Sequence, residues 1–504
     1  MNQYTNVSLY YNRLAFRGFE NGRRVSKVID YSPSLFVPSN KPTKWKTFST
    51  PLEILKPTDE IFVERMKFAN IKECRSFIKQ YENYENFPIF GFTRYPYAFI
   101  ADTYQDTSRF VDNFDKLHIA IIDIEVSSEK GFPTPEQANE EITAITVYIS
   151  NDKKYHTFGC GEYKEERKDI KYHKFEYEHE LLQGFITFWS SNYPDILTGY
   201  NSTFFDIPYL YNRIKKVLGE DIAKKLSPWN MVSERHIRVM QKDHQVFELV
   251  GIDNLDYLDL YKKFSTKTDH ENFKLNTVVA YELGEKKIDF SEFSSLQKLY
   301  KNDFQKFIRY NIQDVELIKK LDEKLQLMQL SVYMAYNAKV NFQDVFSQVL
   351  MWDVIIFDYF LKHNLVLPPN KRDNGVRPAG AFVKEPVPKL YHWVLSYDLD
   401  SLYPNLIVQF NISPDTLIHK CGQMKDFSHE NVINSDIDTQ FLKQKEMTVA
   451  GNGQLFSTKK QGFLPSIIEP MYQERKEMKQ KMLHAEIQLE HIEEELHNRN
   501  IEYK

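Results

Sequence analysis

Two carboxylates with D-x-E spacing follow a short apolar run and are the first residues in this chain that could do chemistry. Residues 119–122 are Ile-Ala-Ile-Ile, and Asp123 and Glu125 follow. A run of this kind favours a buried strand. Side chains two apart on a strand leave the same face, so these acids would repel each other unless a divalent cation lay between them. The alternative is a pair of solvated acids at a strand end.

A third acid stands where a helix is predicted to begin. Residues 195–214 contain a short apolar strand, a Gly-Tyr-Asn turn, and then a helix opened by Asp206, with Pro208 near its first turn. An acid in this position can also be a simple helix cap.

A fourth acid lies on a predicted helix over residues 302–324. Tyr310 and Asp314 are four residues apart and therefore share one face of that helix. A tyrosine there could equally be a plain core residue.

These residues lie in a region of strands and helices that begins near residue 111. Residues 141–150 are predicted to form an antiparallel partner for the D-x-E strand, and residues 179–191 have helical spacing. Residues 235–250 are predicted to form a β-hairpin with a polar turn at Lys242–His244. Residues 255–264 are predicted to form a strand leading into a helix.

The flanking segments differ from this region. Residues 1–110 are predicted to be mostly β, with a helix at 70–84, and residues 325–370 are predicted to be helical. Pro, Gly and basic residues concentrate at 367–380 and indicate a domain boundary. Residues 392–413 are predicted to form an apolar strand, a tight turn and a helix. One long helix with near-heptad apolar spacing is predicted at the end of the chain.

Composition is that of a large globular chain. At 504 residues it exceeds one hydrophobic core, and about three domains are expected. The net charge of −5 gives no global basic signal for nucleic acid, although a local basic channel can lie on an acidic body. Three scattered cysteines do not fit a disulfide framework or a thiolate zinc site. No signal pattern or apolar run of about 18 residues is present, so we expect a soluble, intracellular protein without membrane contact.

Taken together, the acids form an ordered series. A strand-borne D-x-E, an N-x4-D entering a helix (Asn201 to Asp206) and a helix-borne Y-x3-D occur in that order. The series resembles the three exonuclease motifs in the proofreading domains of DNA polymerases. The resemblance implies two Mg²⁺ ions held by carboxylates. Asp123, Glu125 and Asp314 would hold one ion, Asp123 would bridge to the second, Asp206 would hold the second, and Tyr310 would orient the attacking water.

A second motif is SYDLDSLYPNLI at residues 396–407. It resembles motif A of family B DNA polymerases, for which D-x-x-S-L-Y-P is diagnostic. The resemblance implies that Asp398 ends a strand and binds two further Mg²⁺ ions. Ser401 and Leu402 would present backbone N–H groups to a triphosphate. Tyr403 would lie beneath the incoming sugar and exclude a 2′-hydroxyl.

Two weaker resemblances extend the same family. MYQERKEMKQKM on the terminal helix is similar to the opening of the fingers helix, so Arg475 and Lys479 would grip triphosphate oxygens. The alternative is a solvated helix face. RPAGAFVKEP (377–386) resembles the linker that touches template but keeps only Gly380 of a double glycine. The hairpin at 235–250 would match the element that separates primer from template, and LDYLDLYKKF and NISPDT fit the bacteriophage branch of the family.

The fold class implied is α/β multidomain. The expected domains are a mostly β N-terminal domain (1–110, with 325–370 returning to it), an RNase H-like 3′→5′ exonuclease domain (111–324), a partial α+β palm with motif A (371–460) and the first fingers helix (461–504).

The chain departs from the family pattern in one respect. It contains neither the motif B helix (K-x3-N-S-x-Y-G) nor the motif C hairpin (D-T-D-S). Asp398 is then one carboxylate where two are required. We therefore expect the N-terminal subunit of a replicative polymerase encoded in two pieces, with a truncated fragment as the alternative.

The resemblance also implies partners and a location. The partners are DNA (primer–template and single-stranded 3′ ends), dNTP together with a C-terminal polymerase subunit, and replisome proteins such as a sliding clamp, reached through that subunit. The location is the cytoplasm of a phage-infected host cell. Two other functions stay open, a stand-alone 3′→5′ exonuclease and a non-catalytic nucleic-acid-binding protein. The ordered series of acids makes the latter the weaker alternative.

Overall fold

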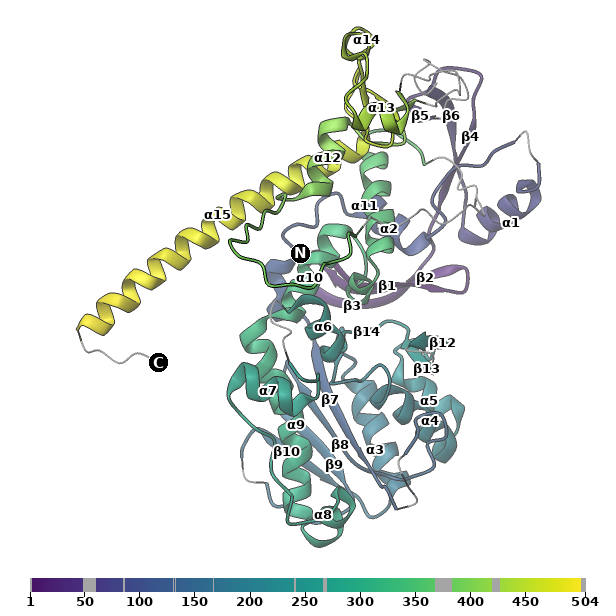
Figure 1. The fold of residues 1–504 in the computed structure, drawn as a ribbon. Coiled ribbons are helices and arrows are strands. Elements are labelled where there is room, and N and C mark those ends of the chain that lie inside the picture. Colours follow the sequence, from purple (N-terminus) through teal and green to yellow (C-terminus); the bar gives the residue numbers. More distant parts are fainter. Residues whose placement is uncertain are drawn as a thin grey trace. The chain divides into compact units, whose positions relative to one another are not determined.

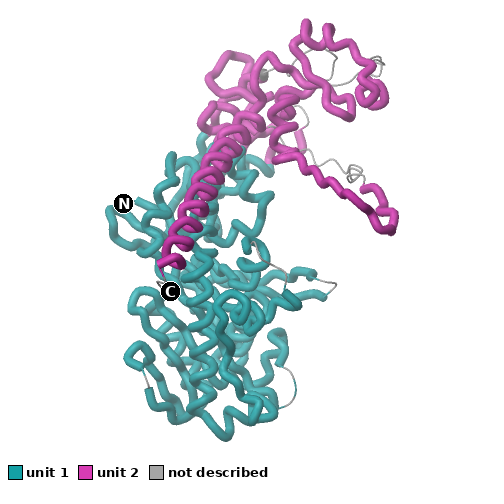
Figure 2. Tube along the Cα trace, turned by 60° about the vertical axis from the view of Figure 1, so that its left-hand side comes forward, with its two compact units in different colours: residues 1–34, 67–79, 92–358 teal, residues 35–66, 80–91, 359–504 magenta. Residues whose placement is uncertain are grey.

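The computed structural model describes residues 2–48, 60–84, 87–129, 131, 133–165, 167–239, 242–265, 270–367, 383–418 and 427–499. The chain forms two compact units, coloured separately in Figure 2. The first comprises residues 1–34, 67–79 and 92–358, and the second comprises residues 35–66, 80–91 and 359–504. Both units mix helices and strands, so the expected α/β multidomain fold is confirmed. The domain boundaries stay predictions, and the boundary segment 367–380 lies, apart from Leu367, outside the described residues.

A six-stranded mixed sheet in the first unit carries the D-x-E pair. Its strand order is β10-β9-β8-β7-β11-β14. The pairs β7–β8 and β8–β9 are antiparallel, and the other three pairs are parallel. The predicted strand over 141–150 and its antiparallel pairing are confirmed. The strands are β7 (Ile119–Val126), β8 (Ile142–Ile149), β9 (Lys154–Gly159), β10 (Ile170–Lys174), β11 (Ile196–Thr198) and β14 (Asp253–Asn254).

The helices predicted over 70–84, 179–191 and 302–324 are confirmed as α1, α3 and α9. The segment 255–264 is almost entirely helix α6, because the strand before it ends at Asn254. The helices up to residue 362 are α1 (Ile71–Tyr81), α2 (Tyr95–Thr103), α3 (Glu178–Ser191), α4 (Asp206–Leu218), α5 (Glu220–Ala223), α6 (Tyr257–Phe264), α7 (Leu275–Leu283), α8 (Leu296–Asn302), α9 (Phe304–Leu325), α10 (Leu327–Ala338) and α11 (Gln348–Lys362), with 3-10 helices η1 (Phe110–Lys116), η2 (Lys224–Leu226) and η3 (Phe342–Phe346).

Helices lie on both faces of the six-stranded sheet (Figure 1). Ile122 and Ile124 of β7 pack into one hydrophobic core with residues of α3 and α4. Since alternate side chains of a strand point to opposite faces, Asp123 and Glu125 face the other side, where α9 packs on β7 and β8. The face with Ile122 and Ile124 thus anchors β7, and the opposite face carries the acids after Ile119 and Ile121.

An antiparallel three-stranded sheet stands at the N-terminus, in the order β1 (Gln3–Tyr10), β2 (Arg13–Glu20), β3 (Arg23–Ile29). Segments near residue 340 return to it. The Gln3 side-chain amide donates to Tyr336 Oη at 2.6 Å, and the Val7 backbone N–H donates to Asn341 Oδ1 at 2.9 Å.

A buried acid ties this N-terminal sheet to the larger sheet. Asp195, directly before β11, is fully buried. Its carboxylate accepts hydrogen bonds from Thr5 Oγ1 at 2.9 Å, from Arg24 Nη1 at 2.7 Å and from the backbone N–H of His118 at 2.8 Å. Arg17 lies 3.7 Å away. Burial alone would raise the pKa of Asp195, but the two guanidinium groups hold it below its usual value.

The predicted hairpin is present, but its predicted turn is wrong. The strands are β12 (Val232–Val239) and β13 (Lys242–Leu249), with Val239 paired to Lys242. Lys242–His244 therefore belong to β13 and not to a turn. Polar residues on an exposed two-stranded ribbon resemble a turn in sequence, because neither face of the ribbon is fully buried.

The second unit contains two small sheets. The first, β4-β6-β5, packs around Phe36, Trp45, Val63 and Phe90, and the second is β15-β17-β16. The elements are β4 (Ser34–Pro38), β5 (Trp45–Phe48), β6 (Glu60–Lys67), α12 (Leu402–Phe410), β15 (Leu417–Ile418), α13 (His429–Ile433), α14 (Thr439–Gln444), β16 (Met447–Val449), β17 (Leu455–Ser457) and α15 (Phe463–Asn498).

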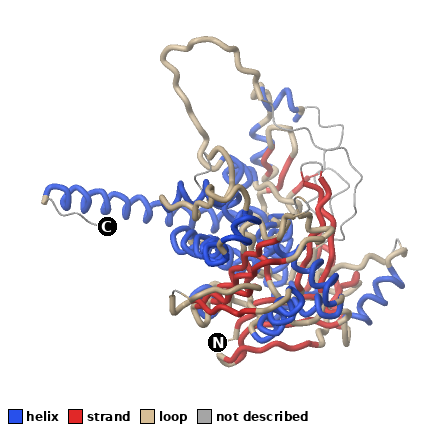
Figure 3. The backbone as a smooth tube through the Cα atoms, turned by 90° about the horizontal axis from the view of Figure 1, so that it is seen from below, coloured by secondary structure: helices blue, strands red, loops and turns tan. Residues whose placement is uncertain are grey.

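The strand predicted before Asp398 is wrong. Residues 391–400 form neither helix nor strand and belong to the loops drawn in tan in Figure 3. All ten residues are exposed. Trp393 is 99% exposed and Leu395 is 79% exposed. A strand needs a neighbour to satisfy its backbone groups, and none of the described strands pairs with this segment. The turn and helix predicted after Asp398 are confirmed, since α12 begins at Leu402.

The long terminal helix predicted from the sequence is confirmed as α15, which runs for 36 residues. Apolar side chains at near-heptad spacing, among them Met478, Met482, Leu489 and Ile492, are about half exposed along it. Among the helices that the structure describes, none is long and apolar enough to cross a membrane.

We predict that Asp195→Ala lowers the free energy of unfolding by about 3–5 kcal/mol, because it leaves buried guanidinium charge unpaired. Asp30→Ala is the matched control. Its partner Arg13 and Asp30 itself are 50% and 69% exposed, and the expected cost is about 0–1 kcal/mol. Urea unfolding of the full chain followed by circular dichroism measures both, and equal losses would contradict this assignment.

Candidate active site: buried carboxylates of strand β7 and helix α9

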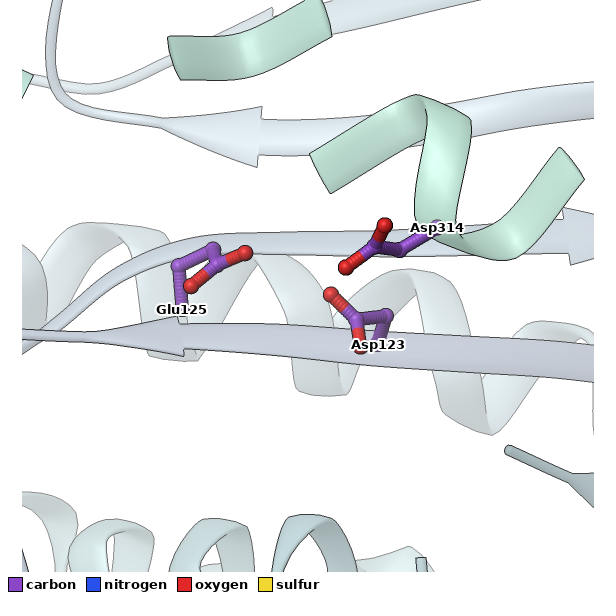
Figure 4. A group of neighbouring side chains, drawn as sticks. All are labelled: Asp123, Glu125 and Asp314. Carbon is purple, nitrogen blue, oxygen red and sulfur yellow. The ribbon is translucent and has the colours of Figure 1, made fainter. Parts of the chain in front are cut away.

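Strand β7 holds its two acids in a fixed register. Asp123 stands opposite Thr146 of β8, and Glu125 stands opposite Ala144. Glu125 is only 8% exposed. The strand is paired with β11 at residues 119–121 and with β8 at residues 120–126, so pairing with β8 fixes the backbone at the two acids. The prediction that both acids leave the same face of a strand is confirmed (Figure 4).

Helix α9 brings Asp314 to the same place. Figure 4 shows Asp314 directed from the helix toward Asp123 and Glu125. One oxygen from each of the three carboxylates lies within 4.8 Å of the others. Asp314 is 4% exposed, and its Oδ1 is buried without a hydrogen-bond partner. A buried carboxylate oxygen in that state is costly unless a ligand occupies it.

Asp206 lies next to this group but outside it. It begins helix α4 and is 4% exposed. Its Oδ1 accepts a hydrogen bond of 3.2 Å from the backbone N–H of Ile124, which lies between the two acids of β7. The helix has no side-chain cap at Phe205. Asp206 is therefore tied to the strand that carries the other acids and is not a simple cap.

The turn before Asp206 is held by Asp256, which the sequence analysis missed. The Asp256 carboxylate accepts hydrogen bonds from the backbone N–H groups of Asn201 at 3.0 Å and Thr203 at 2.9 Å. It also caps helix α6 through the N–H of Leu258 at 3.0 Å. At Gly199 a Cβ atom would lie 2.7 Å from the carbonyl oxygen of Ile122, so the turn approaches β7 too closely for a side chain. The one sequence signal for Asp256 was an acid directly before a helix.

Lys287 was also missed. Its Nζ lies 2.5 Å from Asp314 Oδ2 and 4.6 Å from the ring centroid of Tyr310. Burial would lower the pKa of Lys287, but the charge of Asp314 raises it. The residue sits in a loop between α7 and α8 with no motif around it, so only the tertiary structure assigns it to the site.

Tyr310 stands one turn before Asp314 on α9 and is 9% exposed. Its ring packs edge-on against Phe290 at a centroid distance of 5.3 Å. Burial and the neighbouring Asp314 raise the pKa of the phenol, so its hydroxyl stays protonated and can donate a hydrogen bond. Tyr310 is thus in the site and is not only a core residue.

The acids of the site are held more protonated than usual. Burial raises the pKa of Asp123 well above its usual value, and Asp314, Glu125 and Asp206 raise it further. Burial, reinforced by Asp314, raises the pKa of Glu125 to about 8. Burial also raises the pKa of Asp206 to about 7 and that of Asp314 to about 6. One lysine does not compensate four carboxylates, so the site lacks positive charge.

This donor set fits a divalent cation. Its ligand atoms are carboxylate oxygens, which hard cations such as Mg²⁺ and Mn²⁺ prefer. The unpartnered Asp314 Oδ1 supplies a free donor atom among them. Asp123, Glu125 and Asp314 converge as predicted, whereas Asp206 joins them through the backbone of β7.

The motif A residues lie in the second unit and do not form a comparable group. Asp398 is exposed in the irregular segment before α12. Ser401 is the residue before helix α12 and has a left-handed backbone with φ of 48°. The backbone N–H groups of Ser401 and Leu402 thus lie at a helix N-terminus, their predicted contact with a triphosphate stays a prediction, and Tyr403 is 74% exposed.

Arg475 and Lys479 are exposed and one turn apart on helix α15. The same helix contacts the motif A turn, because Tyr472 Oη donates to Asp400 Oδ2 at 3.1 Å. Roles for these residues in nucleotide binding stay predictions. Most of the linker predicted to touch template, residues 377–382, lies outside the described residues.

Comparison with known families matches both regions of the chain. The exonuclease domain of DNA polymerase family B matches residues 92–278, which include Asp123, Glu125 and Asp206. DNA polymerase family B matches residues 346–504, which include Asp398. Both matched regions belong to one family. The chain belongs to the family B DNA polymerases.

Bacteriophage proteins are among the most similar relatives, as the sequence analysis expected. The DNA-directed DNA polymerase of Escherichia phage RB69 is 36% identical over 95% of this chain and 54% of its own length. That of Enterobacteria phage T4 is 31% identical over 94% of this chain and 53% of its own length. The DNA polymerase delta catalytic subunit of Bos taurus is 27% identical over 62% of this chain and 28% of its own length. The chain thus spans about half the length of the two phage relatives.

The raised pKa values predict that the metal-free protein becomes less stable to unfolding as pH rises. Between the usual pKa of a glutamate and about 8, folded Glu125 binds more protons than unfolded Glu125, so the free energy of unfolding falls as pH rises. Glu125→Gln should therefore stabilise the chain by roughly 1–2 kcal/mol near pH 8 in EDTA and by almost nothing near pH 4.

Thermal unfolding at both pH values measures this effect. Glu136→Gln, at an exposed position, is the control and should change little. Adding Mn²⁺ near pH 8 should stabilise wild type more than Glu125→Gln. A Glu125→Gln variant that is less stable than wild type in EDTA at both pH values would contradict the assignment.

Proposed function

We propose that residues 111–324 form a 3′→5′ exonuclease that hydrolyses DNA from single-stranded 3′ ends. The observation that carries this proposal is the group of three carboxylates, Asp123 half-buried and Glu125 and Asp314 buried, whose oxygens lie within 4.8 Å of one another. A solvated pair of acids would not be buried, and a structural ion pair would not leave Asp314 Oδ1 without a partner.

Two divalent ions, which we propose to be Mg²⁺, would supply a hydroxide nucleophile near neutral pH and neutralise charge on the phosphate. Asp123, Glu125 and Asp314 would hold one ion, and Asp123 and Asp206 the other. The water oxygen forms a bond to phosphorus, and the bond from phosphorus to the 3′ oxygen of the preceding nucleotide breaks. The terminal nucleotide leaves as a 5′-monophosphate, and the shortened strand keeps a 3′-hydroxyl.

The chain's own residues orient this reaction. Tyr310 is neutral, and its hydroxyl can donate to or accept from the attacking water. Lys287, bonded to Asp314 and over the Tyr310 ring, places a cation where negative charge develops on the phosphate. The β12–β13 hairpin is proposed to help separate primer from template.

We predict that the chain shortens a 5′-labelled single-stranded oligonucleotide with Mg²⁺ and not in EDTA. Changing Asp123 and Glu125 together to Ala should lower the rate by roughly 10³-fold or more, because the ligands are lost. Asp269 and Glu271 have the same D-x-E spacing without an apolar strand around them. The Asp269→Ala/Glu271→Ala double variant is therefore the control and should keep the wild-type rate. Binding of the oligonucleotide without cleavage would support a non-catalytic binding protein instead.

We further propose that the second unit contributes to a DNA polymerase site. The observation that favours this function is the family B match over residues 346–504, which includes the D-x-x-S-L-Y-P motif at Asp398. These 504 residues contain neither motif B nor motif C. Synthesis would therefore require a polypeptide that provides them, and this need for a partner, like contact with a sliding clamp, is a proposal. The irregular segment 391–400 fits this view, since its strand neighbours would also come from that polypeptide.

Primer extension tests this second proposal. The 504-residue chain should not extend a primer–template with dNTPs by itself, and should do so when a polypeptide carrying motifs B and C is added. Asp398→Ala should abolish extension by the mixture and leave exonuclease activity intact. Asp400→Asn is the control and should keep extension. Extension by the 504 residues alone, or none with the added polypeptide, would overturn the proposal.

A further inference from the structure

A series of three hydrogen bonds leads from Thr157 to the Asp123 carboxylate. Thr157 of β9 and Thr146 of β8 face each other with their Oγ1 atoms 2.9 Å apart. Thr146 Oγ1 donates to Asn311 Oδ1 of α9 at 2.5 Å. Asn311 Nδ2 donates to Asp123 Oδ2 at 2.6 Å. The two threonines and Asn311 are fully buried, so water does not compete with the bonds among them, and the bond from Asn311 to half-buried Asp123 is partly buried.

The donors and acceptors in this series of hydrogen bonds can be assigned in only one way. The backbone carbonyl of Asp123, 3.4 Å from Asn311 Nδ2, can only accept, and so can the Asp123 carboxylate in the ionised form that binds a cation, so the Asn311 amide turns its NH₂ group toward Asp123. Its carbonyl oxygen then needs a donor, which is the hydroxyl of Thr146. Because the Thr146 hydroxyl donates its one hydrogen to Asn311, it must accept the hydrogen bond from Thr157. Each step therefore fixes the orientation of the next group.

The last acceptor in this series of hydrogen bonds is Asp123, the acid that the proposed mechanism uses most. A hydrogen bond from a neutral donor stabilises the ionised form of a carboxylate and fixes its plane. Asp123 is the acid assigned to both ions, and an error in its orientation would affect both. Groups that hold a ligand from behind in this way commonly change metal affinity by about 10–100-fold when removed.

We propose that Asn311, oriented by Thr146 and Thr157, is a positioning residue that fixes the Asp123 carboxylate for cation binding. This proposal rests on the proposed function, because it assumes that Asp123 is a cation ligand. Asn311 itself does not touch the reacting atoms. It follows Tyr310 directly in sequence, so α9 presents three residues of the site (Tyr310, Asn311 and Asp314) within about one turn and a half.

The alternative is that Thr146, Thr157 and Asn311 only satisfy one another's hydrogen-bonding groups inside the core. Both the positioning role and the structural role predict some loss of stability on substitution, so a measurement of stability does not distinguish them. Cation affinity does, because Thr146 makes no hydrogen bond to a carboxylate of the site and reaches Asp123 only through Asn311.

Mn²⁺ titration of the full-length chain, followed by electron paramagnetic resonance, measures affinity without turnover. Asn311→Leu should weaken Mn²⁺ binding by roughly 10–100-fold, and Thr146→Val, which keeps the side-chain shape, by roughly 3–10-fold. The variant with both changes should bind Mn²⁺ no more weakly than Asn311→Leu, because both changes interrupt the same series of hydrogen bonds.

Thr198→Val is the matched control. Thr198 is fully buried on β11 of the same sheet, and its Oγ1 donates to the carbonyl of Leu255 at 2.5 Å. It should cost stability and leave Mn²⁺ affinity unchanged. Circular dichroism checks that each variant is folded, and Thr146→Val decides the question if Asn311→Leu is not.

The possible outcomes separate the two proposals. Wild type that binds no Mn²⁺ would overturn the metal site itself. Wild type that binds Mn²⁺, with a folded Thr146→Val variant that binds it equally well, would overturn the role of Asn311 and leave the metal site standing. Loss of affinity in Thr198→Val equal to that in Thr146→Val would assign the effect to general packing.

Discussion

Repulsion between buried carboxylates is the constraint around which the first unit is built. Asp123, Glu125 and Asp314 converge within 4.8 Å, and Asp206 lies close by. Groups with such charge would separate or remain protonated if their backbones were free to move. The six-stranded sheet, the core under α3 and α4, and helix α9 prevent the separation. The site therefore carries more negative charge than Lys287 alone can neutralise.

The supporting residues have the same purpose at each acid. Asp256 holds the turn that leads to Asp206, and Asn311 orients Asp123. Lys287 pairs with Asp314 and lies against Tyr310. Each support comes from a different element. Lys287 offers a positive charge and Asn311 a donor to an acid, whereas Asp256 accepts hydrogen bonds from the backbone of the turn. An active site of this kind is fixed by the second layer of residues as much as by the ligands.

Sequence periodicity predicted the parts of this arrangement that are local. D-x-E on a strand and Y-x3-D on a helix follow from the two repeat lengths of secondary structure, and both predictions hold. Lys287, Asp256 and Asn311 were missed because their roles arise from contacts between distant segments. The strand before Asp398 was predicted wrongly for a related reason. Its apolar residues fit a strand, but pairing requires a neighbour that none of the described strands provides.

The most direct test of the account is anomalous X-ray diffraction from crystals soaked in Mn²⁺. The account predicts an anomalous difference peak between the carboxylates of Asp123, Glu125 and Asp314, at oxygen–metal distances of about 2.0–2.4 Å. The peak should be absent in crystals of Asp123→Asn. A fully occupied wild-type crystal with Mn²⁺ peaks elsewhere and none among these three carboxylates would contradict the central claim.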